Sequence, residues 1–299
     1  MAESLINTKR RINTIRSTEK ITKARKLVAS VKYQRWKKRY TSNLGYEKAR
    51  QEIRYTAFGC LNEKDKLPDA MVSHKEAKKK LYIIRTSTLG LCGAYNYNVF
   101  KRIDKELTED DELLLIGSKG ISHYTNKNYE RKEDYSNLRN HFTFGQVKHL
   151  RHEIVNLYRT GKYKEVHLVY THYKNSLNFI PQDEIILPFK ADKEEVEKRK
   201  EAYPPLIEPD KREVISTTIL HYLDARIYQK LIESEISELC SRRNAMETAT
   251  DSAEQIRGEL RIQYNKSRQN AITQEITEVV AGANAGKKKR RLGGTTYGR

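Results

Sequence analysis

The histidines and cysteines are the residues best suited to catalysis or metal binding, and their spacing argues against both. Cys60, Cys92 and Cys240 lie far apart and form neither a metal-ligand motif nor a disulfide framework. Among the eight histidines, His149 and His152 are the one pair at helical, metal-like spacing, and two ligands do not complete a site. We therefore expect no metal and no cofactor, and a reducing compartment.

Two glycine-containing segments resemble catalytic loops only superficially. Gly117-Ser118-Lys119-Gly120 follows an apolar run but lacks the G-x-x-x-x-G-K-[ST] spacing that lets backbone amides surround a phosphate. Gly90-Leu91-Cys92-Gly93 has no serine between its glycines, so it is not a nucleophile elbow. We predict an ordinary strand-to-helix turn for the first segment and a tight turn with a buried thiol for the second. No residue is nominated as catalytic.

The two ends of the chain have the period of long helices. No proline precedes Pro68, and none follows Pro209. Apolar residues at helical spacing occupy one predicted face of residues 1–55: Leu5, Ile12, Ile15, Ala24, Leu27, Val28 and Val31. A second helix is predicted from Asp210, which forms a capping box with Glu213, to about Ala281, ending at Gly282.

The second helix carries a heptad seam. Its positions are Ile232, Ile236, Leu239, Met246, Ala249, Ala253, Ile256 and Leu260. A helix of this length cannot be covered by one globular core, so it must pack on another helix. The first 55 residues are the only comparable partner, and the two helices are predicted to form an antiparallel coiled coil.

The middle of the chain changes to the period of strands and short helices. Predicted strands are Leu81–Thr86, Asp111–Gly117, Glu165–His172 and an edge strand, Asn178–Phe189, limited by prolines. Predicted helices lie near Tyr95–Leu107, Ile121–Asn126 and Gly145–Tyr158. The expected fold class is α/β, with a small Rossmann-like middle domain beside the coiled coil. The expected division is 1–55, 75–190, 210–285 and a basic tail at 286–299.

Charge is concentrated at the ends of the sequence. The net charge is +19; residues 1–55 hold 16 Lys and Arg against 4 Asp and Glu, and residues 286–299 hold 6 against none. This pattern suggests an acidic or polyanionic partner. With 19 tyrosines, a basic coiled-coil protein that binds nucleic acid is a minor alternative. No stretch is apolar enough to span a membrane, and the first eleven residues lack a secretory signal's apolar segment.

Four blocks of sequence, in order along the chain, resemble the gamma subunit of F-type ATP synthases, of a divergent bacterial type. They are Lys20–Ala24 with Leu27–Ala29, Gly90–Gly93 with Asn96, Arg242 with Ala245, Met246, Ala249 and Thr250, and Asn265–Gln269 with Ala271–Thr273 and Glu275. The resemblance implies a non-catalytic central-stalk rotor that couples nucleotide turnover to rotation, and a role in ATP synthesis and hydrogen ion transport. Its terminal helices would turn inside a ring of alpha and beta subunits, which handle ATP.

The resemblance also implies further partners and a location. An epsilon-like subunit and a membrane rotor ring are expected, with the complex peripheral to the cytoplasmic face of the cell membrane. No nucleic acid and no direct membrane span are expected. The implied partner interface consists of Lys20, Lys23, Arg25, Arg242, Arg268, Gln269, Thr273 and Glu275. Their charges, amides and hydroxyls can exchange partners as a shaft turns.

Departures from the family pattern, among them Thr88-Leu89 where family members tend to carry a charged pair, leave an alternative open. Arg25 and Leu27 stand where family members tend to carry methionine, and fourteen residues, Gly286–Arg299, follow the usual end. The alternative is a gamma-like shaft of a specialised F-like ATPase that is not coupled to an ordinary proton rotor. The basic tail is expected to be mobile or held by acidic residues of a partner.

Overall fold

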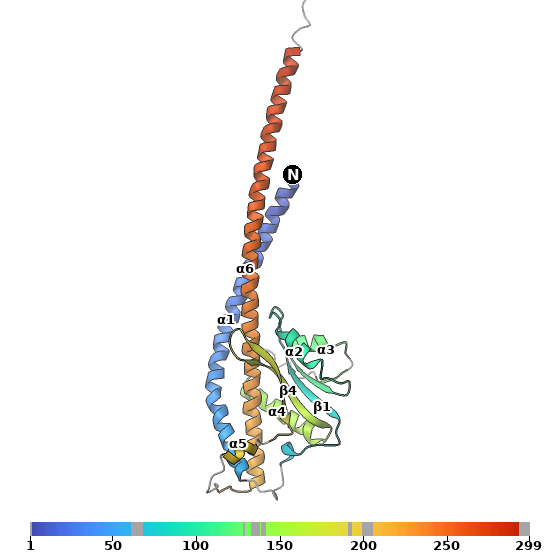
Figure 1. Ribbon diagram of the computed structural model, residues 1–299, viewed down its shortest axis with the longest axis vertical. Coiled ribbons are helices and arrows are strands. Elements are labelled where there is room, and N and C mark those ends of the chain that lie inside the picture. The colour runs from blue at the N-terminus through green and yellow to red at the C-terminus, as the bar shows by residue number, and fades with distance from the viewer. Residues whose placement is uncertain are drawn as a thin grey trace, which may run out of the picture. The chain divides into compact units, whose positions relative to one another are not determined.

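The structure, a computed structural model, consists of two long helices and a central sheet (Figure 1). It describes residues 2–60, 68–127, 129–132, 138, 142–190, 193–198 and 206–292. Helix α1 spans Ala2–Gly59 and helix α6 spans Lys211–Leu292. The chain divides into two compact units: the first contains the residues up to Lys26 and from Met246, and the second contains Leu27–Ala245. These units cut across both helices, whereas the sequence division followed secondary structure.

The second unit contains a five-stranded sheet in the order β3-β2-β1-β4-β5. The strands are β1 (Lys79–Arg85), β2 (Glu112–Ile116), β3 (Glu130–Lys132), β4 (Tyr163–Tyr173) and β5 (Phe179–Leu187). Neighbouring strands are parallel except β5, which runs antiparallel to β4 at the edge. The shorter helices are η1 (Asp69–Met71), α2 (Tyr95–Ile103), α3 (Ser118–Tyr124), α4 (Phe144–Arg159) and α5 (Lys193–Lys198). The expected fold class is confirmed.

Alternating side chains place two apolar clusters on the two faces of the sheet. Tyr82 and Ile84 of β1 pack with Val99 and Ile103 of α2 on one face. On the other face, strand, α4 and α6 residues form the larger cluster, which also includes Tyr33 and Trp36 of α1: Leu81, Ile83, Leu114, Leu150, Ile154, Leu168, Ile227, Leu231 and Ile236 are among them. The sheet therefore joins the long helices through its larger cluster.

Helix α6 is the centre of the second unit. Every residue from Gln229 to Ser241 is buried, so this stretch is enclosed on all sides. Its seam residues Ile232, Ile236 and Leu239 belong to the sheet's larger cluster. The predicted seam therefore has two roles. Its first residues pack in the apolar cluster on the sheet, and the predicted coiled coil accounts only for its later part.

Three local predictions were incomplete or wrong. Strand β3, and helix α5 between β5 and α6, have no counterpart among the elements predicted from the sequence. The structure shows one half of the predicted capping box: the Asp210 carboxylate accepts the Glu213 backbone N–H at 3.2 Å. The helix end predicted at Gly282 is wrong, because α6 continues to Leu292. One glycine costs a helix only about 1 kcal/mol, and no proline follows to stop it. Residues 293–299 of the predicted tail lie outside the described residues.

Candidate partner interface

The first unit is an antiparallel pair of helices with a largely polar seam. Across it, Thr250 Oγ1 donates to Thr22 Oγ1 at 2.7 Å. Thr8, Glu19 and Thr22 are buried on α1, and Ile12 and Ile15 are half-buried. On α6 the buried seam residues are Met246, Thr250, Ala253 and Leu260, whereas the predicted Ile256 is exposed. The seam is therefore built from hydroxyls and charges as much as from apolar groups.

Ion pairs align the two helices of this unit. Lys23 Nζ bonds Glu19 at 2.8 Å and Glu254 at 2.7 Å, and Arg257 pairs with Glu19 at 2.9 Å. The bond to Lys23 lowers the pKa of Glu19, and the Glu19 and Glu254 carboxylates raise the pKa of Lys23. Lys23, predicted to meet a partner, is thus engaged between the helices.

Only the first part of the apolar face predicted for the first helix is covered. Leu5, Ile12 and Ile15 are half-buried, whereas Ala24, Leu27, Val28 and Val31 are exposed. The period was correct, but polar residues on the adjacent face take the helix contact. Those four side chains remain available to another surface.

The last part of α6 is exposed around its whole circumference. Leu260 is the last buried residue among the side chains described on α6, which end at Asn284, and every residue from Ile272 to Asn284 is exposed. The predicted interface residues Arg268, Gln269, Thr273 and Glu275 all lie on this exposed stretch. Large apolar side chains are exposed beside them: Ile262, Ile272, Ile276, Val279 and Val280. A helix that leaves this much apolar surface uncovered is typical of one that contacts other proteins.

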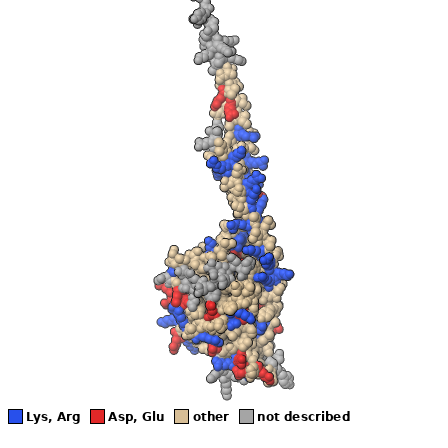
Figure 2. All heavy atoms as spheres, turned by 180° about the vertical axis from the view of Figure 1, so that it is seen from behind, with Lys and Arg blue, Asp and Glu red and all other residues tan. Residues whose placement is uncertain are grey.

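Positive charge lies on the surface of the paired helices. Lys20 and Arg25 of α1 are exposed, and Figure 2 shows lysines and arginines gathered along this part of the molecule. Residues 2–26 contain eight Lys and Arg against two acids. An acidic surface is the electrostatic complement of this region.

Arg242 is bound within the chain and holds the loop after β1. Its Nη2 donates to Leu89 O at 2.9 Å and pairs with Glu238 at 2.7 Å. Ser241 Oγ donates to Cys92 O at 2.6 Å. Cys92 is buried, as the tight-turn prediction required, and Leu89 and Leu91 project into solvent. Arg242 therefore positions an exposed leucine pair, and the structure does not leave its guanidinium free for a partner.

Leu91 adopts a backbone conformation that is unusual for its type. Its φ is 62°, in the left-handed region that side chains other than glycine seldom adopt. Gly93 follows with φ 56°, and a Cβ there would lie 3.3 Å from Ser241 Oγ. The close approach of the loop to α6 keeps this conformation, and such strain is common at functional sites.

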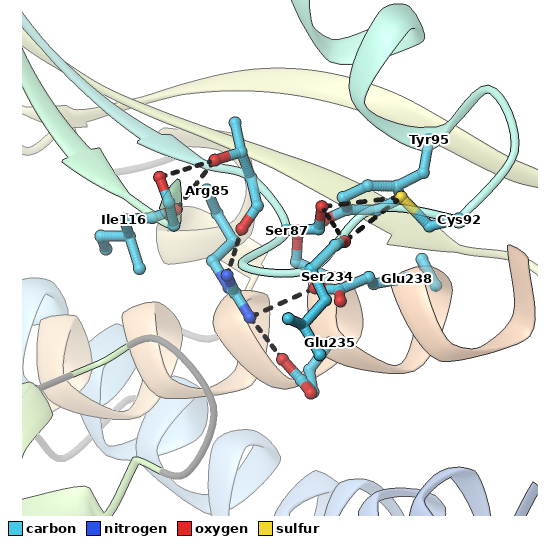
Figure 3. Close-up of polar contacts among 12 residues, drawn as sticks. Arg85, Ser87, Cys92, Tyr95, Ile116, Ser234, Glu235 and Glu238 are labelled. Carbon is cyan, nitrogen blue, oxygen red and sulfur yellow. Dashed lines mark hydrogen bonds and ion pairs between the residues drawn. The ribbon is translucent and has the colours of Figure 1, made fainter. Parts of the chain in front are cut away.

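A buried charge cluster lies below this loop (Figure 3). Arg85, at the end of β1, is fully buried and pairs with Glu235 of α6 and, at 3.6 Å, with Glu238. Tyr95 and Ser234 share a hydrogen bond of 2.8 Å beside it. This cluster was not predicted from the sequence, although an arginine ending an apolar strand and glutamates flanking seam positions were visible signals.

Burial raises the pKa of Glu235 to about 7, and the neighbouring Glu238 carboxylate adds to the rise. Between about pH 4.3, where the unfolded glutamate titrates, and about pH 7, the folded chain holds a proton that the unfolded chain has released. Raising the pH through this window therefore removes stability.

We expect Glu235→Gln to remove this pH dependence. Between pH 5 and pH 8 the variant should gain about 2–3 kcal/mol relative to wild type, measured as the free energy of unfolding in urea. Glu106→Gln, which alters an exposed carboxylate, is the control and should track wild type. A constant difference between wild type and Glu235→Gln across this range would contradict the expectation.

Other candidate chemistry is not assembled. His149 and His152 are both exposed on α4. Within the described residues, no group of three or more His, Cys, Asp or Glu side chains is placed to hold a metal ion. In the same part of the chain, no helix is both long and apolar enough to cross a membrane.

Comparisons with known proteins agree with this architecture. The family model described as ATP synthase matches residues 4–285. An ATP synthase gamma chain of Mycoplasma capricolum is 36% identical over 94% of this chain and 98% of its own, and one of Mesoplasma florum is 35% identical over the same shares. A chain from the cryo-EM structure of the Euglena gracilis mitochondrial ATP synthase (OSCP/F1/c-ring, rotational state 3) has a TM-score of 0.66 at 19% identity, with complete coverage of both chains. Through these matches, the chain is shown to belong to the ATP synthase gamma-chain family.

Proposed function

We propose that this chain is the non-catalytic central-stalk rotor of an F-type ATP synthase or ATPase, coupling nucleotide turnover in the other subunits to rotation. The observation that carries the proposal is the exposed end of α6, from Ile272 to Asn284, with its mixed apolar and polar surface. Such a surface needs a surrounding partner. Membership of the gamma-chain family supports alpha and beta subunits as that partner.

The mixture of side chains suits a shaft that must pass several rotational positions. Arg268, Gln269, Thr273 and Glu275 can exchange hydrogen bonds with different partners, at about 1–3 kcal/mol for each charge-assisted bond. Ile276 and Val279 add hydrophobic contacts, which do not require a particular direction of approach. Neither kind of contact fixes one orientation.

Lys20 and Arg25 support a second contact with the same ring. Both are exposed cations, and neither takes part in an ion pair among the described residues. Leu89 and Leu91 of the loop held by Arg242 are a third candidate contact. We assign acidic loops of the surrounding subunits to the cations and an apolar surface to the leucines.

An epsilon-like subunit and a membrane rotor ring complete the proposed assembly, which would be peripheral at the cytoplasmic face of the cell membrane. The family match is consistent with this location. A shaft of a specialised F-like ATPase without an ordinary proton rotor is the alternative. Isolating the native complex and identifying its membrane subunits distinguishes the two.

The test of the shaft role replaces Arg268 and Gln269 together by alanine in the assembled complex. Loss of two polar contacts with the ring should lower ATPase turnover or complex yield by about tenfold or more. The measurement is ATP hydrolysis per assembled complex, together with subunit stoichiometry.

The matched control replaces Lys48 and Arg50, which lie on the α1 part of the second unit, by alanine. We expect turnover within about twofold of wild type, because Lys48 is an exposed charge and half-buried Arg50 donates to Tyr46 of its own helix. Similar small losses in both double variants would contradict a role for Arg268 and Gln269 in partner contact.

A further inference from the structure

Arg54 of α1 is a buried cation that has no acceptor among the described residues. The residue is only 6% exposed, and its Nε is buried with no hydrogen-bond partner. Its guanidinium lies over the rings of Tyr222 at 4.2 Å, Tyr55 at 4.3 Å and Phe189 at 5.5 Å. Aromatic faces stabilise the charge but accept no conventional hydrogen bonds. Buried guanidinium groups are normally paired with an anion, so this arrangement calls for one.

The side chain of Arg54 lines a cavity of about 170 Å³ in the second unit. The cavity wall also contains Lys190, Arg226, Glu184, Phe189 and Tyr222. Sites for drug-sized ligands measure about 300–1,000 Å³, and a water molecule in the liquid takes up about 30 Å³. The space therefore suits a small ion with a few waters.

Glu184, the one carboxylate among the described residues that line the cavity, is already engaged. Arg226 binds both oxygens of Glu184, at 2.8 and 3.1 Å, and its third donor pairs with Glu47 at 2.9 Å. Two carboxylates thus share one guanidinium and exceed its charge by one, so with Arg54 and Lys190 these five groups carry a net charge of +1. Arg54 and the exposed Lys190 remain as positive charges without an ion pair in the described part of the chain.

We propose that this cavity binds a phosphate group, with Arg54 supplying paired N–H donors and Lys190 a second positive charge. The planar guanidinium fork matches two phosphate oxygens, and its aromatic stacking holds it in place before the ligand arrives. The group could be free phosphate or the headgroup of an anionic lipid, which present the same chemistry. The proposal does not depend on the rotor function.

The test uses the full chain and inorganic phosphate at constant ionic strength, with binding measured by isothermal titration calorimetry. We expect one saturable site in wild type. Arg54→Gln should weaken binding by about tenfold or more, the loss of a charge-assisted contact. Arg50→Gln, one helical turn earlier, removes the same charge and should bind phosphate as wild type does.

Lys190→Gln is a second variant that does not disturb a buried side chain, and it should weaken phosphate binding by a smaller factor. It keeps the test decisive if Arg54→Gln does not fold, as judged by Trp36 fluorescence. Absence of a saturable site in wild type would overturn the proposal. Equal affinity in wild type and the folded Arg54→Gln variant, or in wild type and Lys190→Gln if Arg54→Gln does not fold, would also overturn it.

Vesicle flotation distinguishes the two sources of phosphate. The chain is basic and will bind phosphatidylcholine vesicles containing phosphatidic acid through its overall charge. The comparison is therefore between Arg54→Gln and Arg50→Gln, which have the same net charge. Weaker flotation of Arg54→Gln, with competition by inorganic phosphate, would identify a lipid headgroup. Equal flotation, with the calorimetric difference retained, would identify free phosphate.

Discussion

Replacing Arg85 by methionine should destabilise the second unit by about 3–5 kcal/mol, because it leaves buried carboxylates without their cation. Glu235 and Glu238 are both buried, and of these two carboxylates Arg242 pairs only with Glu238. Methionine has nearly the length of arginine, so the cavity left is small and the charge is the main change. Urea unfolding at pH 8 is the measurement.

Trp36, the one tryptophan of the sequence, is a natural fluorescent probe for this unit. It is buried, 4.8 Å from the ring of Phe142. The control is Arg102→Met, which breaks an exposed ion pair with Glu106 and should cost less than about 1 kcal/mol. If both variants unfold at the same urea concentration, the buried pair does not stabilise the fold as argued.

Replacing Gly117 by alanine should cost about 3–5 kcal/mol, the sum of backbone strain and overpacking. Its φ is 113°, and an added Cβ would lie 2.2 Å from the carbonyl oxygen of Thr86. Thr86 cannot move away freely, because its N–H donates to Ile116 O at 2.8 Å and its Oγ1 accepts the Gly120 N–H at 2.9 Å. The turn between β2 and α3 therefore requires glycine.

The variant Gly161→Ala separates the cost of backbone strain from the cost of overpacking. Gly161 has φ 75°, but an added Cβ meets no atom within 4 Å, so only the backbone strain of about 1–2 kcal/mol applies. The difference between the two variants in urea unfolding measures the clash with Thr86. Equal destabilisation would mean that the chain relaxes around the new methyl group.

The sequence by itself determined the elements with a long or strong local signal. Two helices free of proline, four apolar strand runs and the Gly117 turn are all visible in residue type and spacing. Family motifs such as Gly90–Gly93 and Asn265–Gln269 indicated the function before any contact was known. These signals are local because helix period, strand alternation and glycine turns depend on neighbouring residues.

Only the tertiary structure decided which face of each helix is covered. The stripe containing Leu27 and Val28 is exposed, while Glu19 and Thr22 line the helix contact. Hydrophobic period cannot make this distinction when a partner outside the chain covers part of the apolar surface. Long-range charge pairs have the same limit: Arg85 and Glu235 are 150 residues apart, and only folding brings them together. Burial then makes these charges costly unless they are paired, and a sequence pattern does not show which residues will be buried.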